Sequence, residues 1–259
     1  MPPARLESLV GINVRIIPLP WLLPPSDELA GRAVVVFDVI RAATTIAHAL
    51  AAGATEVRAF PSLETARAAR AAFGGAAVLA GERDCHRPAG FDLGNSPGEM
   101  TAASVGGRVV FLTTTNGTRA LDVVATAGTA AGDNDPPCYV AALVNATATA
   151  ARLAGDGRDV VLLCAGSDGQ LAEEDLIGAG AVLAGLRRNG ALGAVDDPAG
   201  AADWFARHER DFPNVFRQTR GARKLSAAGL GADLAYCERL DAVPVVARVH
   251  DGMRIRRWG

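Results

Sequence analysis

Short apolar runs rich in valine, leucine and isoleucine alternate along the chain with alanine-rich stretches typical of helices. The apolar runs are nearly continuous in hydrophobicity, as expected for strands that are buried on both faces. This alternation predicts an α/β fold, with a mainly parallel sheet and helices on both faces. The predicted strands are Val34–Phe37, Glu56–Phe60, Ala76–Ala80, Arg108–Thr113, Asp159–Cys164 and Val243–Val249, and the predicted helices are Thr44–Ala52, Leu63–Phe73, Gly117–Ala127, Ala146–Ala154 and Glu174–Arg188.

The alternation weakens after Asn189, and residues 191–238 are interpreted as a helical elaboration on the same domain. Because no internal repeat or linker is found, residues 1–259 are predicted to form a single α/β domain. The arginine-rich segment Met253–Trp258 fits a solvated tail or a subunit contact better than a nucleic-acid patch.

Composition limits the classes of ligand. With 26 basic and 28 acidic residues the net charge is −2, so no large positive field attracts nucleic acid or anionic lipid. Any bound anion must therefore be held by local groups. The four cysteines lack metal-ligand spacing and suit reduced thiols, and the sequence shows neither a signal peptide nor a membrane segment. A cytoplasmic location is expected.

Polar clusters follow four of the predicted strands. In open parallel sheets ligands bind beyond the carboxyl ends of the strands, so these clusters are the first candidates for a site. They are Asp38, Arg41, Thr44 and Thr45; Gly81, Glu82 and Arg83; Thr113 to Arg119; and Gly166 to Gly169 followed by Glu173, Glu174 and Asp175.

The segment from Thr113 to Arg119 is the most informative cluster. Its three threonines, Asn116 and Gly117 lie at a strand-to-helix junction, where hydroxyls and free backbone N–H groups can surround a phosphate. Alternatively, Asn116 and Gly117 form a tight turn and the threonines only cap the helix.

Acid-base pairs follow two strands. In the functional interpretation Arg41 binds an oxyanion and Asp38 is a metal ligand or a nucleophile. Glu82 and Arg83 repeat the pairing, although such pairs also cap helices and form structural ion pairs.

Other candidates are weaker on spacing alone. The Gly90–Glu99 loop is compatible with a purely structural role. Glu174 and Asp175 could bind magnesium, or their negative charges could only interact favourably with the dipole at the start of the helix. Cys164 suits an apolar core thiol better than a nucleophile. Neither a Walker loop nor GxGxxG is present, which disfavours ATP and NAD sites.

Five motifs in order resemble the 2-phosphosulfolactate phosphatase family. They are DVIRAATTI from Asp38, GER from Gly81, GFDLGNSP from Gly90, TTTNGT from Thr113, and CAG followed by EDLIGAG from Glu174. The resemblance implies a Mg²⁺-dependent phosphomonoester hydrolase with an α/β fold. It would act on 2-phospho-3-sulfolactate, in coenzyme M biosynthesis.

The resemblance carries over to single residues that match motif positions. Arg41, Arg83 and the threonine-asparagine loop are interpreted as oxyanion donors, and Asp38, Glu82 and Asp175 as magnesium ligands. Ala43 departs from the family pattern, which usually has a hydroxyl residue there. Metal-bound water and a protein carboxylate both remain open as the nucleophile. The matching residues are Asp38, Arg41, Thr44, Glu82, Arg83, Asn95, Ser96, Thr114, Thr115, Asn116, Gly117, Thr118 and Asp175.

Rival interpretations keep the same site. A non-catalytic sensor of a phosphorylated metabolite would need the oxyanion donors but not the full set of carboxylates, and a phosphoryl transferase would need a nucleotide loop. Arg41 and Arg83, with Arg119 as a possible third, exceed what one phosphate held by magnesium requires, which predicts a substrate with a second anionic group beside its phosphate. Alternatively, these arginines form structural ion pairs with Asp38, Glu82 or Asp122. Apolar residues of Val243–Val249 with Trp204 and Phe205 suggest a homo-oligomer such as a homodimer, although they can equally cover a sheet edge.

Overall fold

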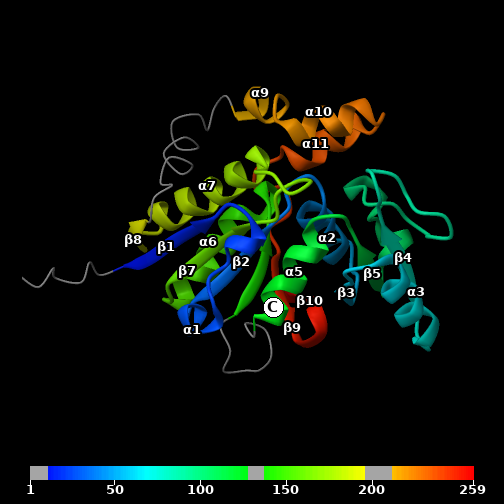
Figure 1. Cartoon of the computed structure of the whole chain (residues 1–259), viewed down its shortest axis with the longest axis horizontal. Helices are drawn as coiled ribbons and strands as arrows, with labels where there is room; N and C mark the ends of the chain where they lie inside the picture. The colour runs from blue at the N-terminus through cyan, green and yellow to red at the C-terminus, as the bar shows by residue number, and fades with distance from the viewer. Residues whose placement is uncertain (1–10, 128–136, 196–211) are drawn as a thin grey trace, which may run out of the picture.

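A computed structural model describes residues 11–127, 137–195 and 212–259, and within them one ten-stranded sheet forms the centre of the molecule (Figure 1). The strand order is β4-β5-β3-β10-β9-β6-β2-β7-β1-β8. The strands are β1 (Ile12–Ile17), β2 (Ala33–Phe37), β3 (Glu56–Ala59), β4 (Ala77–Gly81), β5 (Val109–Thr113), β6 (Cys138–Ala141), β7 (Val160–Cys164), β8 (Leu192–Val195), β9 (Val246–His250) and β10 (Arg254–Trp258).

Two parallel sets of strands are joined by an antiparallel hairpin. β4, β5 and β3 form one set, and β6, β2, β7, β1 and β8 form the other. The hairpin of β9 and β10 pairs with β6 on one side and with β3 on the other. The predicted mainly parallel sheet is confirmed, with these antiparallel pairings as an addition.

The C-terminal segment differs from its prediction as a solvated tail. Arg254–Trp258 is an interior strand of the sheet, with Ile255 fully buried. Its arginines are accommodated locally, because Arg256 pairs with Glu56 at 2.7 Å and Arg248 of β9 lies 4.2 Å from the Trp258 ring centroid. The strand predicted over Val243–Val249 is also interior, so its buried apolar side chains give no support to a homodimer. Trp204 and Phe205 lie outside the described residues.

Helices cover both faces of the sheet (Figure 1). All five predicted helices are confirmed to within two residues at each end. They are α2 (Ala42–Ala51), α3 (Leu63–Ala72), α5 (Gly117–Thr126), α6 (Ala146–Asp156) and α7 (Glu173–Arg188). Local sequence fixes their ends: a Ser62–Thr65 capping box begins α3, and Gly157, in the left-handed conformation at φ 62°, ends α6.

Short helices complete the described structure. They are η1 (Pro20–Leu22), α1 (Ser26–Leu29), η2 (Pro97–Glu99), α4 (Ala102–Val105), η3 (Leu143–Asn145), α9 (Phe212–Phe216), α10 (Arg220–Ala227), η4 (Gly231–Asp233), α11 (Leu234–Cys237) and η5 (Asp251–Met253). Helices α9 and α10 pack against α7, and α11 packs against η2, η3 and η4 (Figure 1). Among the described residues no helix is both long and apolar enough to cross a membrane.

Candidate active site

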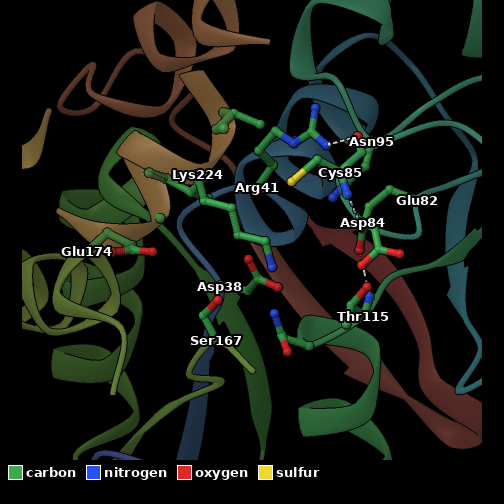
Figure 2. Close-up of a pocket in the computed structure, with 14 residues that line it drawn as sticks. Asp38, Arg41, Glu82, Asp84, Cys85, Asn95, Thr115, Ser167, Glu174 and Lys224 are labelled. Carbon is green, nitrogen blue, oxygen red and sulfur yellow. Dashed lines mark hydrogen bonds between the residues drawn. The ribbon is translucent and has the colours of Figure 1, made fainter. Parts of the chain in front are cut away.

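A pocket opens where the loops after β2, β4, β5 and β7 meet helix α10 (Figure 2). Asp38 follows β2, Glu82 follows β4, Thr115 and Asn116 follow β5, and Ser167 follows β7. The structure therefore brings together all four polar clusters that the sequence places after strands. The charged residues of the lining are Asp38, Arg41, Glu82, Asp84, Glu174 and Lys224.

Asp38 lies between the first turns of two helices and is almost completely buried. Its Oδ1 accepts a hydrogen bond from Ala42 N of α2 at 3.2 Å, and Gly117 N of α5 also donates to its carboxylate. A Cβ on Gly117 would lie 2.5 Å from Asp38 Oδ2, so glycine is required for α5 to approach this closely. Burial, then the negative charge of Glu82, raises the pKa of Asp38 to about 7.

Glu82 links the loops after β4 and β5. Its two carboxylate oxygens accept hydrogen bonds from Thr115 N at 2.6 Å and from Cys85 N at 3.0 Å. These bonds fix the side chain at the pocket wall while each oxygen keeps a further lone pair. Burial raises the pKa of the Cys85 thiol, which disfavours a thiolate nucleophile.

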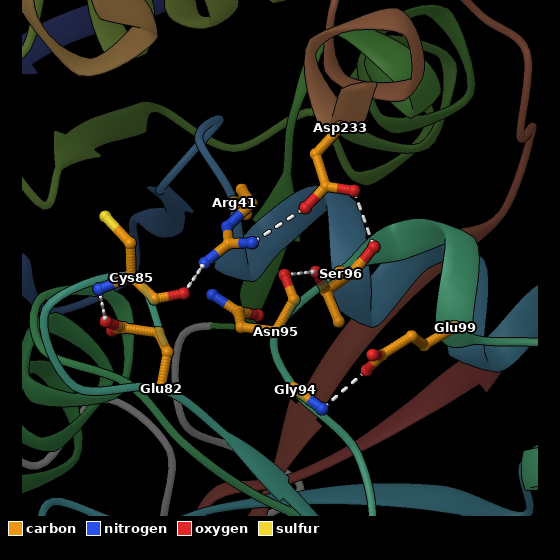
Figure 3. Close-up of polar contacts among 9 residues, drawn as sticks. Arg41, Glu82, Cys85, Gly94, Asn95, Ser96, Glu99 and Asp233 are labelled. Carbon is orange, nitrogen blue, oxygen red and sulfur yellow. Dashed lines mark hydrogen bonds and ion pairs between the residues drawn. The ribbon is translucent and has the colours of Figure 1, made fainter. Parts of the chain in front are cut away.

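Arg41 belongs to a buried polar network (Figure 3). Its Nη1 donates to Asp233 Oδ2 at 2.7 Å, and its Nη2 donates to the Cys85 carbonyl at 2.7 Å. Ser96 Oγ donates to the other oxygen of Asp233 at 2.5 Å. Both terminal nitrogens of Arg41 are thus engaged by protein acceptors, and the side chain is only 4% exposed.

Asn95 is placed in the pocket by the loop before η2. Thr45 Oγ1 of α2 donates to the Asn95 backbone carbonyl at 3.0 Å and fixes that loop. Asn95 Oδ1 is buried and accepts no hydrogen bond in the described structure. A buried polar atom of this kind requires a ligand, an ion or a water as its partner.

Glu174 and Asp175 begin helix α7 but face different groups. Glu174 lines the pocket, is 2% exposed, and its Oε2 is buried with no hydrogen-bond partner in the described structure. Asp175 turns its two oxygens to Val39 N at 2.8 Å and Gly166 N at 3.1 Å and is not part of the pocket lining. Burial raises the pKa of both carboxyl groups.

Several residues predicted for the site lie outside the pocket lining. Arg83 donates to the Glu82 carbonyl at 2.6 Å and to Thr113 Oγ1 at 3.0 Å. Thr44 Oγ1 donates to the Val39 carbonyl, and Thr114 and Thr118 bond to each other's backbone as a cap of α5. Of the predicted hydroxyls in that loop, Thr115 is the one in the lining, and its Oγ1 is buried without a partner in the described structure.

Sequence reasoning missed several residues of the site, among them Asp84, Cys85, Lys224 and Asp233. Asp84 and Cys85 follow the GER motif directly, and both have positive φ, at 50° and 69°, which re-aims the loop. Lys224 and Asp233 come from the segment whose hydrophobic pattern is weak. The signal available for Lys224 was compositional, because it is the only lysine among 259 residues.

Metal binding can be judged from the donors. Within residues 11–127, 137–195 and 212–259, no three His, Cys, Asp or Glu side chains are close enough to hold a metal ion by themselves. Magnesium ordinarily needs fewer, since it takes one or two carboxylates and completes its shell with water and substrate phosphate. Asp38 and Glu82, with the unpartnered oxygens of Glu174 and Asn95, offer hard oxygen donors of this type.

Comparisons with known proteins agree on one family. A family model described as 2-phosphosulpholactate phosphatase matches residues 19–252. Similar proteins named "Probable 2-phosphosulfolactate phosphatase" include one from Thermus thermophilus, 40% identical over 243 residues, covering 90% of this chain and 96% of the relative. Another from Symbiobacterium thermophilum is 37% identical over 237 residues, covering 89% of this chain and 96% of the relative.

Proposed function

The chain belongs to the 2-phosphosulfolactate phosphatase family of phosphoric monoester hydrolases, and from this premise we propose that it is a magnesium-dependent phosphatase. Its proposed substrate is 2-phospho-3-sulfolactate or a related small phosphorylated acid, which is hydrolysed to the hydroxy acid and phosphate. The observation that carries the proposal is the convergence of four carboxylates in one pocket with hydroxyl and amide donors from Thr115, Asn95 and Asn116.

The charge of the pocket supports the cation. Four carboxylates and two basic side chains line it, so the dianionic phosphate would meet a net negative wall. A divalent cation reverses that balance. We assign the ion to Asp38 and Glu82, because Asp175 already satisfies two backbone N–H groups away from the pocket lining.

The protein groups can perform the remaining steps of phosphoryl transfer. Thr115 Oγ1 and the Asn116 amide are donors for the phosphoryl oxygens, at the start of α5 where the helix dipole favours negative charge. Arg41 adds fixed positive charge to the wall. Bound magnesium would stabilise the charge that develops on the phosphoryl oxygens and lower the pKa of a coordinated water.

The protonation state of Asp38 matters for its proposed role, because a base, a nucleophile and a magnesium ligand all need the carboxylate form. Its oxygens are oriented by Ala42 N and Gly117 N, and a pKa of about 7 in the metal-free pocket allows it to hold a proton at neutral pH. A magnesium ligand at this position must release that proton.

We further propose a cytoplasmic location and a step in coenzyme M biosynthesis, and a homodimer stays a prediction.

The proposed function predicts phosphate release that requires magnesium. The purified protein, assayed over small phosphorylated acids with Mg²⁺, is expected to release phosphate from 2-phosphosulfolactate, and excess EDTA is expected to abolish it. An Asp38→Asn preparation purified identically controls for contaminating phosphatases. Full activity in EDTA, or equal activity of the control, would contradict the proposal.

A further inference from the structure

The two basic side chains of the pocket differ in their freedom to bind a ligand. Arg41 is held by the buried ion pair with Asp233 and by the Cys85 carbonyl. Removing one partner from a buried ion pair costs about 3–5 kcal/mol, so Arg41 is a fixed part of the wall.

Lys224 is held far more weakly. Its Nζ lies 2.7 Å from Asp168 Oδ2, and the two side chains are 42% and 53% exposed. An exposed pair of this kind contributes only about 0–1 kcal/mol, so the ammonium group can exchange Asp168 for a ligand at little cost. Asp168 itself does not line the pocket.

Helix α10 is shaped to present Lys224 to the pocket (Figure 2). Gly221, Lys224 and Leu225 share one face at helical spacing, and all three line the pocket. A Cβ on Gly221 would overlap the Glu174 carboxylate, so glycine lets α10 approach the start of α7. The hydrogen bond that Lys224 Nζ donates to Asp168 raises the pKa of Lys224, which keeps the side chain charged at neutral pH.

Composition singles out the same residue. Of the 26 lysine and arginine residues, Lys224 is the one lysine. Arginine presents a rigid planar fork, whereas lysine carries a compact charge on a flexible stem that can follow a ligand. The one ammonium side chain of the sequence therefore lies in the pocket wall, where its flexible stem lets the charge move toward a ligand.

We propose that Lys224 forms a subsite for the second anionic group of the substrate, the carboxylate or sulfonate carried beside the phosphate. This inference rests on the proposed phosphatase function. The phosphate would lie near Asp38, Glu82 and Asn116, which come from the carboxyl ends of the strands, while Lys224 comes from the separate wall formed by α10. The subsite replaces Arg83 as the reader of the second charge, because the Arg83 guanidinium is bonded to Glu82 O and Thr113 Oγ1.

A kinetic comparison tests the subsite. The ratio of kcat/KM for 2-phosphosulfolactate to that for ethyl phosphate, which lacks a second anion, is measured for the wild type, Lys224→Met and Arg223→Met. Arg223 is the matched control, because it is the neighbouring cation on α10 but does not line the pocket. Lys224→Met is expected to lower the ratio roughly tenfold or more, and Arg223→Met to leave it unchanged. An unchanged ratio in Lys224→Met, or an equal fall in Arg223→Met, would overturn the proposal.

A binding experiment gives an answer that does not depend on catalysis. Reductive methylation with ¹³C-formaldehyde labels the one lysine side chain and the N-terminal amine, and the Lys224→Arg variant identifies the lysine signal by NMR. Sulfolactate, which carries both anions but no phosphate, is expected to shift the lysine signal more than inorganic phosphate does. A larger response to phosphate would assign Lys224 to the phosphoryl group instead. If the wild type hydrolyses none of the phosphorylated acids but its lysine signal still responds to sulfolactate, the phosphatase proposal is refuted and the anion subsite is not.

Discussion

At the scale of single residues, the site depends on carboxylates that the backbone holds in place. Asp38 accepts N–H groups from α2 and α5, and Glu82 accepts N–H groups from two loops. Such bonds orient each group before a ligand arrives, so little entropy is lost on binding. The arrangement costs stability without a cation, because Glu82 and Glu174 both repel the negative charge of Asp38.

Asp38→Asn is expected to lower turnover at least ~100-fold, because the amide can neither transfer a proton at neutral pH nor bind magnesium as a carboxylate does. The measurement is kcat with saturating magnesium, together with circular dichroism to verify the fold. Asp159→Asn is the matched control, because its Oδ1 accepts Asn13 N at 2.9 Å and it is not part of the pocket lining. Turnover near that of the wild type in Asp38→Asn would leave Asp38 as a helix cap.

Sequence reasoning located the residues that follow the strands but not the direction of each side chain. Glu82 faces the pocket while Arg83 faces Thr113, because successive side chains in an extended segment point to opposite sides. Thr114 and Thr118 were indistinguishable from Thr115 by composition, and the structure uses them as a cap. Which hydroxyl remains free depends on hydrogen bonds that close only in the folded loop.

At the scale of elements, apolar length explains only part of what the sequence predicted. The strands β2, β4, β5 and β7 have runs of four or more apolar residues and were predicted. β6 was missed although all four of its residues are apolar, and β10 has one apolar residue between arginines. β10 is stabilised by partners distant in sequence, including Glu56 and the Arg152 side chain against Trp258. No local pattern in β10 contains that information. The helical elaboration interpreted over residues 191–238 contains the helices α9, α10 and α11, but it also contains the strand β8.

Helix α10 gives a prediction of its own. Gly221→Ala would place a methyl group against the Glu174 carboxylate, so α10 must move outward and carry Lys224 with it. We expect kcat/KM for the anionic substrate to fall roughly tenfold while helix content stays unchanged. Gly155→Ala in α6 is the matched control, because a Cβ there meets nothing within 4 Å. An equal effect of both substitutions would show that the close approach of α10 is unimportant.

At the scale of the whole molecule, the buried carboxylates link stability to pH and to the cation. The pKa of Asp38 is raised from 3.8 to about 7 by burial and then by Glu82. Between these two values the folded state holds a proton that the unfolded state has released. Stability contributed by the protonated group is therefore present below pH 3.8 and is lost as the pH rises to about 7.

The difference between the wild type and Asp38→Asn separates this effect from the histidines and from the carboxyl groups outside the pocket, and it includes the change that the loss of the Asp38 charge makes to Asp175. Without metal, the free energy of unfolding of Asp38→Asn relative to wild type is expected to rise by up to about 1.4 kcal/mol per pH unit through that window and then level off. Above that window, the free energy of unfolding of Asp38→Asn relative to wild type should be about 1 kcal/mol lower than the value obtained by integrating the slope. The reason is that only the oxygen of the amide can accept a hydrogen bond, so the variant cannot accept from both Ala42 N and Gly117 N as the carboxylate does. Urea unfolding between pH 5 and 8.5 measures the curve.

Magnesium should reverse the order of the two proteins if Asp38 is a ligand. The cation binds the deprotonated wild-type site and stabilises it by RT ln(1 + [Mg²⁺]/Kd), whereas Asp38→Asn lacks the charge that attracts it. Adding Mg²⁺ at pH 8 is therefore expected to raise the unfolding midpoint of the wild type but not of the variant, and the gain should shrink at pH 5.5 as protons compete for Asp38. An equal gain for both proteins at both pH values would place the cation elsewhere. A flat difference curve without metal would instead mean that water reaches Asp38 and keeps its pKa near the ordinary value.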